Sequence, residues 1–216
     1  AGAVPSLPCA RANQAKSHRH LLPRDSRSSA FLQPLGQVMS RDSSNNSVDR
    51  VVSSDSEQLI LVNCDDAEAG YMDKGQCHDG DGILHRAFSL FIFNSNGELL
   101  LQKRAAGKRL WPMYWSNSCC SHPRKGESLM EATARRLADE LGIQARLEFV
   151  YKFNYQARFG DKGSENELCS VFLGCSDDPV RPNLTEVAAI RHVQASALAR
   201  ELQSSPQAFT PWFKME

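Results

Sequence analysis

The residues with the clearest chemical potential lie between positions 78 and 167 of the chain. Within residues 115–123, the thiol of Cys120 stands two residues before an imidazole, and tryptophan and proline flank the segment. Three imidazoles and two carboxylates accompany this thiol: His78, His85, His122, Glu165 and Glu167. Imidazole nitrogen and carboxylate oxygen together suit Mn, Fe or Zn better than Mg or Ca. These residue types predict a metal-assisted acid–base enzyme in which the imidazoles hold an ion and the thiol reacts.

The spacing of the proposed ligands limits how they can converge. Glu165 and Glu167 are two residues apart, so on a strand their side chains lie on the same face. His78 must then come from a loop, His85 from the start of a strand and His122 from a Cys–His–Pro turn. The alternative for each histidine is a solvated or hydrogen-bonded side chain. For Cys120 the alternative is inert packing.

A charged helix provides the second signal. Residues 127–141 combine regularly spaced apolar residues with charged ones, and Gly142 follows where a helix would end. The helix resembles a Nudix box, a loop–helix–loop that holds divalent cations against a diphosphate, through Glu127, Arg135, Leu137, Asp139, Glu140, Gly142 and Ile143. Ser121 replaces the initial Gly of the box, and Arg136 replaces a Glu that hydrolysis needs. Diphosphate binding therefore stays plausible, with Glu140 as a Mg²⁺ ligand; a solvated surface helix is the alternative.

Several cations could neutralise a diphosphate. Lys74, Arg104, Lys108 and Arg136 are suited to charge-assisted hydrogen bonds with phosphate oxygens. Without further argument, the pairs at positions 103–104 and 108–109 are equally compatible with ordinary charges at the end of a hairpin.

The elements that must position these residues are mostly strands. Residues 58–63, 87–93, 98–102, 147–157 and 168–174 are predicted as strands, and Asn96-Gly97 is a favourable turn for a hairpin. A short helix is expected around residues 195–203. Strands dominate and one helix carries most of the charge, so the predicted fold class is α+β.

Composition limits the possible functions. The 216 residues are 41% hydrophobic and carry a formal net charge of zero, which gives no global signal for nucleic acid or an anionic membrane. No apolar run approaches the ~20 residues of a membrane span. The seven cysteines are irregularly spaced, which favours a reducing compartment over a disulfide framework.

The first part of the chain differs in kind. Residues 1–56 are rich in Ser, Arg, Gln and Asn, and we expect a disordered leader there, followed by one domain over residues 57–216. An Arg- and Ser-rich, acid-poor leader is typical of an organelle transit peptide, and an untargeted tail is the alternative. The expected location is a plastid if the leader is a transit peptide, and the cytoplasm otherwise.

Taken together, the motifs resemble type I isopentenyl-diphosphate Δ-isomerases, which belong to the Nudix superfamily. The resemblance spans residues 59–212 and depends on five segments: residues 85–89, 115–123, 135–142, 165–167 and 211–212. It implies a Nudix-like mixed β-sheet between helices. It also implies interconversion of isopentenyl and dimethylallyl diphosphate through a tertiary carbocation, in isoprenoid biosynthesis and, in a plastid, carotenoid biosynthesis. The expected partner is a small isoprenoid diphosphate, and the expected state is a monomer.

The resemblance also implies a role for each residue. His78, His85, His122, Glu165 and Glu167 match a site for Mn²⁺ or Zn²⁺, and Glu140 with the backbone carbonyl of Cys120 matches a Mg²⁺ site. Diphosphate contacts fall on Lys74, Arg104, Lys108, Ser121 and Arg136. Cys120 and Glu167 match the acid–base pair, Tyr155 the phenol beside the glutamate, and Trp212 an indole over the reacting carbons.

Two rival functions remain open. A Nudix pyrophosphohydrolase would release phosphate from a diphosphate, which Arg136 in place of the Glu argues against. A non-catalytic protein with structural zinc at Cys119, Cys120 and His122 would unfold with chelator, but no second paired-cysteine motif supports it.

Overall fold

The computed structural model describes residues 50–216. Most of the predicted leader therefore lies outside the described residues. Its last part, residues 50–56, has no regular structure, yet the Val52 side chain is buried and the Asn183 side chain donates a hydrogen bond to the Arg50 carbonyl. Among the described residues, no helix has the length and apolar character needed to cross a membrane.

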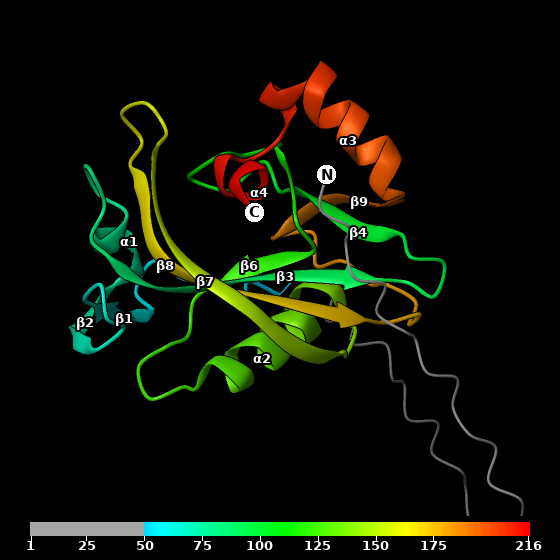
Figure 1. Ribbon diagram of the computed structural model, residues 1–216. Coiled ribbons are helices and arrows are strands. Elements are labelled where there is room, and N and C mark those ends of the chain that lie inside the picture. The colour runs from blue at the N-terminus through cyan, green and yellow to red at the C-terminus, as the bar shows by residue number, and fades with distance from the viewer. Residues whose placement is uncertain (1–49) are drawn as a thin grey trace, which may run out of the picture. The chain divides into compact units, whose positions relative to one another are not determined.

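A mixed sheet forms the centre of the described chain (Figure 1). Its strands are β1 (Gln58–Val62), β2 (Glu68–Asp73), β3 (His85–Phe93), β4 (Leu99–Arg104), β5 (Trp115–Ser116), β6 (Cys119–Ser121), β7 (Arg146–Arg158), β8 (Ser164–Cys175) and β9 (Val187–Val193). The path β2-β1-β3-β4-β5 is extended by β6 and β8 on β3, by β7 on β8, and by β9 on β4. Strands of both directions with separate helices confirm the predicted α+β class.

Strand β3 is the organising strand of the sheet. It pairs with β8 in parallel from His85 opposite Glu167 to Phe93 opposite Cys175, and β6 adds antiparallel pairing. Phe88, Leu90 and Ile92 are almost fully buried, as expected for a central strand covered on both faces. Because β8 begins at Ser164, four residues before the predicted strand, it includes Glu165 and Glu167.

The predicted hairpin around Asn96-Gly97 is present but short. Gly97 adopts a φ of 71°, which glycine tolerates without strain, and the Asn94 side chain accepts backbone hydrogen bonds from Asn96 and Glu98. Beyond the pair Phe93–Leu99 the two strands part, and β4 pairs with β9 and β5 instead. This divergence opens space between β3 and β4 at the end where β6 enters.

Helix α2 (Leu129–Leu141) covers one face of the sheet (Figure 1). It begins two residues later than predicted, because Ser128 is the N-cap and forms a capping box with Glu131. It ends at Gly142, which has the left-handed conformation that favours glycine. Its apolar face packs against β3 and β6 through Ala132, Leu137 and Leu141, among others.

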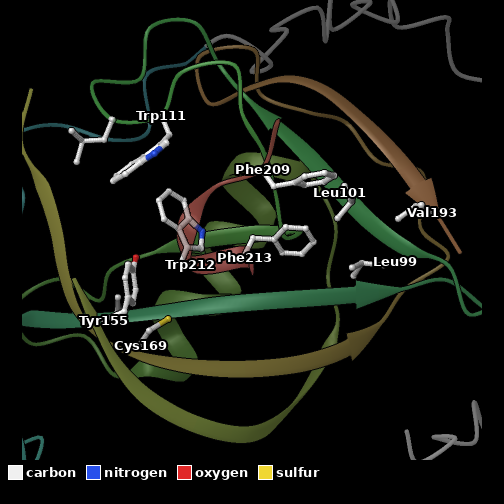
Figure 2. Packing of buried hydrophobic residues seen from close by; sticks show 11 residues of the cluster. Leu99, Leu101, Trp111, Tyr155, Cys169, Val193, Phe209, Trp212 and Phe213 are labelled. Carbon is white, nitrogen blue, oxygen red and sulfur yellow. The ribbon is translucent and has the colours of Figure 1, made fainter. Parts of the chain in front are cut away.

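The opposite face is covered by C-terminal elements. Helix α3 (Ala195–Ser204) confirms the predicted short helix; a 3-10 turn (Pro206–Ala208) and helix α4 (Pro211–Met215) follow it. Figure 2 shows Trp212 and Phe213 of α4 packed among Trp111, Tyr155 and residues of β4 and β8. Helix α4 therefore brings the indole of Trp212 over the same region of the sheet that carries Tyr155.

Candidate active site

Three histidines and two glutamates from separate elements converge on one point. His78 ends α1 (Lys74–Cys77), His85 begins β3, His122 follows β6, and Glu165 and Glu167 lie on β8. One ligand atom from each of the five residues lies within 4.8 Å of the others, a separation that one ion can bridge. The parallel pairing of β3 with β8 explains part of this convergence, since it places His85 beside Glu167.

Hydrogen bonds prepare two of the imidazoles for a cation. Nδ1 of His78 lies 2.7 Å from the Lys74 carbonyl, and Nδ1 of His85 lies 2.7 Å from the Ile83 carbonyl. A carbonyl can only accept, so both Nδ1 atoms carry a proton, and Nε2 is the ring atom of each imidazole that could bind a metal ion. Nε2 of His85 is buried without a hydrogen-bond partner and faces Glu167 at 3.8 Å. This buried set of imidazole nitrogens and carboxylate oxygens fits a divalent metal ion.

The protonation of the group also suits metal binding. Burial, together with the neighbouring imidazole of His78, lowers the pKa of His85 to about 4, and burial lowers the pKa of His122 as well. Burial also disfavours charge on His78 and Glu165, but their contact of 2.8 Å outweighs it, raising the pKa of His78 and lowering that of Glu165. Burial and the nearby Glu165 raise the pKa of Glu167. A divalent cation bound between these residues would compensate the carboxylate charges directly.

Beside this group lies a cavity of about 320 Å³, which is within the range of small-ligand pockets. Most of the predicted site residues line it: Lys74, His78, Arg104, Lys108, Cys120, Ser121, His122, Arg136, Tyr155, Glu165, Glu167 and Trp212. His85 lies behind the lining and is completely buried, and Glu140 is reached through Arg136.

One wall of the cavity combines acid–base groups with an aromatic surface. The Tyr155 hydroxyl donates a 2.7 Å hydrogen bond to Glu167. The Trp212 indole packs edge-on against Trp111 (Figure 2), and its Nε1 donates to the Ser116 hydroxyl. Such an arrangement can hold a proton at a carboxyl group beside an apolar π-surface.

Cys120 belongs to the same cavity. Burial raises the pKa of the Cys120 thiol to about 12, even though the Arg104 guanidinium, 3.9 Å from the sulfur, opposes that shift. This shift favours the protonated thiol. Its neighbour Cys119 is fully buried against the apolar face of α2, as expected for a packing cysteine.

A second wall of the cavity is cationic. The guanidinium of Arg136 is 2% exposed and donates to Glu140 at 2.8 Å, to Glu186 at 3.1 Å and to the Val52 carbonyl. Lys108 forms an ion pair with the same Glu186. Burial, reinforced by the charges of Lys108 and Arg136, lowers the pKa of Lys74 to about 8. Cations gathered in this way form a ready site for a multiply charged anion.

Three contributors to the site were absent from the sequence-based prediction: Glu186, Gly163 and Arg109. Glu186 sits in the loop before β9 and resembles a surface acid in the sequence; nothing local marks it as buried. Gly163 and Arg109 hold the loops around His78: the Gly163 position admits no side chain there, and the Arg109 guanidinium binds the carbonyls of Gly75 and Lys162.

The rival zinc site receives no support from this geometry. Among the described residues, the group that could hold a metal contains His122 but neither Cys119 nor Cys120. Cys119 lies in an apolar cluster with α2, away from the imidazoles.

Comparisons with known proteins agree with the fold and identify the family. Residues 83–213 match the NUDIX domain family. The isopentenyl-diphosphate Delta-isomerase 1 of Photorhabdus laumondii is 43% identical over 162 residues, which cover 74% of this chain and 92% of the relative. The isopentenyl-diphosphate Delta-isomerase of Burkholderia multivorans is 43% identical over 157 residues, covering 73% and 89%.

Solved structures support the fold alone. A Deinococcus radiodurans protein superposes with a TM-score of 0.61 at 20% identity, covering 74% of this chain and 96% of that chain. The MutT protein of Methanosarcina mazei superposes with a TM-score of 0.51 at 21% identity, covering 61% and 88%. Given the domain match and the extent of identity with the curated relatives, the chain belongs to the type I isopentenyl-diphosphate Δ-isomerase family of the Nudix superfamily.

Proposed function

We infer that this protein interconverts isopentenyl diphosphate and dimethylallyl diphosphate in isoprenoid biosynthesis. Two relatives that are 43% identical to the chain are named as isopentenyl-diphosphate Delta-isomerases. The observation that carries the inference is a single cavity with two unlike walls. One wall offers Cys120, Glu167 and the Trp212 indole, and the other offers the cations Lys74, Lys108 and Arg136. An enzyme that isomerises a short isoprenoid diphosphate needs acid–base groups beside the apolar chain and cations beside the diphosphate.

The five-residue His/Glu group is the proposed site of one Mn²⁺ or Zn²⁺ ion, and its mixed nitrogen and oxygen donors favour these ions over Mg²⁺. The ion would compensate the charge of Glu165 and Glu167 and fix the orientation of the latter. Glu140, with the backbone carbonyl of Cys120, is the proposed site of a Mg²⁺ ion that accompanies the diphosphate.

Four cations bind the diphosphate in this proposal, three from the cationic wall and Arg104 from beside Cys120. Lys74, Arg104, Lys108 and Arg136 would contact phosphate oxygens, with Ser121 as a further hydrogen-bond donor. Arg136 replaces the carboxylate that a Nudix hydrolase uses, so the diphosphate is held rather than cleaved. Anchored by its charged end, the five-carbon chain would extend toward Tyr155 and Trp212.

The chemical step adds one proton to the substrate and removes another. Glu167 donates a proton to the terminal alkene carbon of isopentenyl diphosphate, which leaves a positive charge on the tertiary carbon. The Trp212 indole stabilises that charge through its π-face and offers no nucleophile to trap it. Cys120, as thiolate, removes a proton from the neighbouring carbon, and the double bond forms one position along. The aromatic cover excludes water, which would capture the cation as an alcohol.

The base role of Cys120 requires the thiolate, which burial disfavours. Arg104 is the cation that can favour it, since its guanidinium lies against the sulfur in the substrate-free protein. The developing positive charge on the substrate would favour the thiolate further. In the reverse direction Cys120 and Glu167 exchange roles.

Incubation with isopentenyl diphosphate, Mg²⁺ and Mn²⁺, followed by detection of the acid-labile allylic product, tests the function. Cys120→Ser and Glu167→Gln are each expected to lower kcat by about 10²–10⁴-fold, the usual contribution of an acid–base group. Cys64→Ser, at an exposed cysteine, is the matched control and should retain full turnover. Release of inorganic phosphate without allylic product would instead identify a pyrophosphohydrolase.

The cellular location follows as a separate proposal from the composition of residues 1–56 alone. An Arg- and Ser-rich leader fits import into a plastid, where the product would supply carotenoid biosynthesis. A fluorescent protein fused after residue 56 should then accumulate in plastids. Diffuse cytoplasmic fluorescence would contradict the transit-peptide interpretation.

A further inference from the structure

Glu186 is a buried carboxylate in the cavity with no role in the mechanism above. It directly precedes β9, its side chain is 4% exposed, and it lines the cavity on the cationic wall. Carboxylates are seldom buried to this extent unless they are paired. The presence of this negative charge beside a binding site for an anion therefore needs a physical reason.

The contacts of Glu186 give that reason. Its Oε2 atom pairs with Nζ of Lys108 and accepts from Nη2 of Arg136 at 3.1 Å. One carboxylate oxygen thus joins two of the four proposed diphosphate-binding cations, which come from different parts of the chain. Burial works against the charge, yet the two cations hold the pKa of Glu186 below its usual range, so the carboxylate is ionised.

The backbone around Glu186 is fixed from both sides. Its carbonyl accepts a hydrogen bond from the Ala105 amide at the start of the loop that carries Lys108, and its amide donates to the Asn183 carbonyl. The Asn183 amide in turn donates to the carbonyl of Glu140 at the end of α2. The carboxylate is therefore held at a defined place between the Lys108 loop and the helix that carries Arg136.

The two cations differ in how much they depend on this anchor. Arg136 keeps hydrogen bonds to Glu140 and to the Val52 carbonyl when Glu186 is ignored. For Lys108, the described structure gives a side-chain contact with Glu186 alone. A lysine side chain has four rotatable bonds, and repulsion from Arg136 and Lys74 would drive an unpaired ammonium group toward solvent.

We propose that Glu186 is a positioning residue that holds Lys108, and to a smaller extent Arg136, in the orientation that receives the substrate diphosphate. Glu186 itself does not touch the substrate in this arrangement. The substrate class rests on the proposed function, but the anchoring of the cations applies to any diphosphate. Its effect belongs to binding and not to the proton transfers, which take place at Cys120 and Glu167.

Three variants test the assignment. Glu186→Ala removes both the charge and the acceptor, and should raise KM for isopentenyl diphosphate at least tenfold while kcat changes less than about threefold. Glu186→Gln keeps one acceptor oxygen and should give an intermediate KM. Glu201→Gln is the matched control, because it breaks an ion pair with Arg191 away from the cavity, and KM should be unchanged.

Calorimetric titration with inorganic pyrophosphate and Mg²⁺ separates this proposal from the function. Glu186→Ala should weaken pyrophosphate binding about as much as it raises KM. In a double variant with Lys108→Met, the second substitution should add little to the loss, because both changes remove the same anchored cation. Wild-type protein that binds pyrophosphate but forms no allylic product would refute the function and leave this test intact.

Other outcomes would overturn the assignment. An unchanged KM and pyrophosphate affinity, with only the melting temperature lowered, would assign Glu186 a purely structural role. Tighter pyrophosphate binding in Glu186→Gln would show that the carboxylate competes with the diphosphate for the cations. A loss confined to kcat would place Glu186 in the chemical step.

Discussion

At the scale of single residues, the properties of Glu167 depend on its immediate neighbours. The carboxylate lies within reach of His85 and His122 on one side and accepts the Tyr155 hydroxyl on the other. Burial and the nearby Glu165 raise its pKa, whereas the hydrogen bond from Tyr155 opposes that shift. The phenol therefore both orients the carboxylate and stabilises its charged form.

Removal of that phenol gives the first prediction. Tyr155→Phe keeps the ring in place and deletes one hydrogen bond to a charged group, which is worth about 1.5–3 kcal/mol. We expect kcat to fall about 10–100-fold and the pH dependence of kcat to move upward, because Glu167 loses the group that favours its ionised form. Tyr151→Phe on the same strand is the control. A Tyr155→Phe enzyme with unaltered kcat and pH profile would remove Tyr155 from the mechanism.

Lys74 gives a pH-dependent prediction. Its pKa of about 8 results first from burial and then from the charges of Lys108 and Arg136. In the proposed function the ammonium form of Lys74 binds the diphosphate, and the population of that form falls as the pH rises through 8. KM for isopentenyl diphosphate should therefore increase above pH 8, by at most about tenfold per pH unit.

Steady-state kinetics between pH 7 and 9.5 measure this effect. Lys74→Arg is the informative variant, because its guanidinium stays charged throughout the range. Its KM should be nearly independent of pH, even if its absolute value differs from that of the wild type. An equal rise of KM in both proteins would assign the titration to another group.

At the scale of elements, the site depends on strand register. Parallel pairing aligns His85 of β3 with Glu167 of β8, and antiparallel pairing places Cys120 of β6 opposite Ser89 of β3. A shift by one residue would turn these side chains to the other face of the sheet. The central strand thus determines which chemical groups meet in the cavity.

This register explains which features the sequence could predict. Five of the nine strands of the described residues, the Asn96-Gly97 turn and α2 follow from local patterns, as does the shared face of Glu165 and Glu167; β2, β5, β6 and β9 were not predicted. The pairing of β3 with β8 joins residues about eighty positions apart and has no local signal. Residue types alone suggest the five ligands, and the resemblance to a known family implies that they share one ion.

The same limit applies to Glu186. Its burial depends on the Lys108 loop, the end of α2 and the segment before β1 meeting in space. These contacts depend on the tertiary structure, and a single acidic residue in a loop of the sequence does not predict them. Buried ionic groups outside recognisable motifs are therefore the part of the site that sequence reasoning misses.

The tip of the β7–β8 hairpin provides an element-scale prediction. Gly163 has a φ of 132°, and a Cβ there would overlap the carbonyl oxygen of His78. That oxygen accepts the Ser164 amide at 3.0 Å, so the contact joins the hairpin to His78, one of the proposed metal ligands. Gly163→Ala should destabilise the protein by about 3 kcal/mol or more, from steric overlap and backbone strain combined.

Gly160→Ala in the same hairpin is the matched control. Gly160 also has a positive φ, of 54°, but a Cβ there would meet open space. It should cost only the backbone strain, about 1–2 kcal/mol. Denaturant unfolding compares stability, and Mn²⁺ titration should reveal weaker metal binding in Gly163→Ala alone. Equal effects of the two substitutions would indicate that the contact with His78 contributes neither to stability nor to metal binding.

At the scale of the whole molecule, the proposed metal site links distant elements of the fold. Its ligands come from the end of α1, from β3, from the segment after β6 and from β8. An ion that binds only the folded state stabilises it by mass action, by about 2.7 kcal/mol at a free concentration of 100 Kd. The melting temperature of a domain of this size should then rise by about 5–10 °C.

Acid should oppose that stabilisation, and this gives the last prediction. Burial lowers the pKa values of His85 and His122, so below about pH 6.5 the unfolded chain binds protons that the folded state does not. Stability without metal should therefore fall as the pH drops from 6.5 toward 4. The gain in stability from Mn²⁺ or Zn²⁺ should shrink over the same range, because protons compete for the imidazoles of the folded protein and of the unfolded chain.

Thermal unfolding with metal or EDTA at pH 7.5 and pH 5.5 measures both effects. His85→Ala should abolish the metal-dependent rise, whereas His192→Ala, at an exposed position on β9, should preserve it. A rise of equal size in His85→Ala would mean that the metal binds elsewhere on the protein.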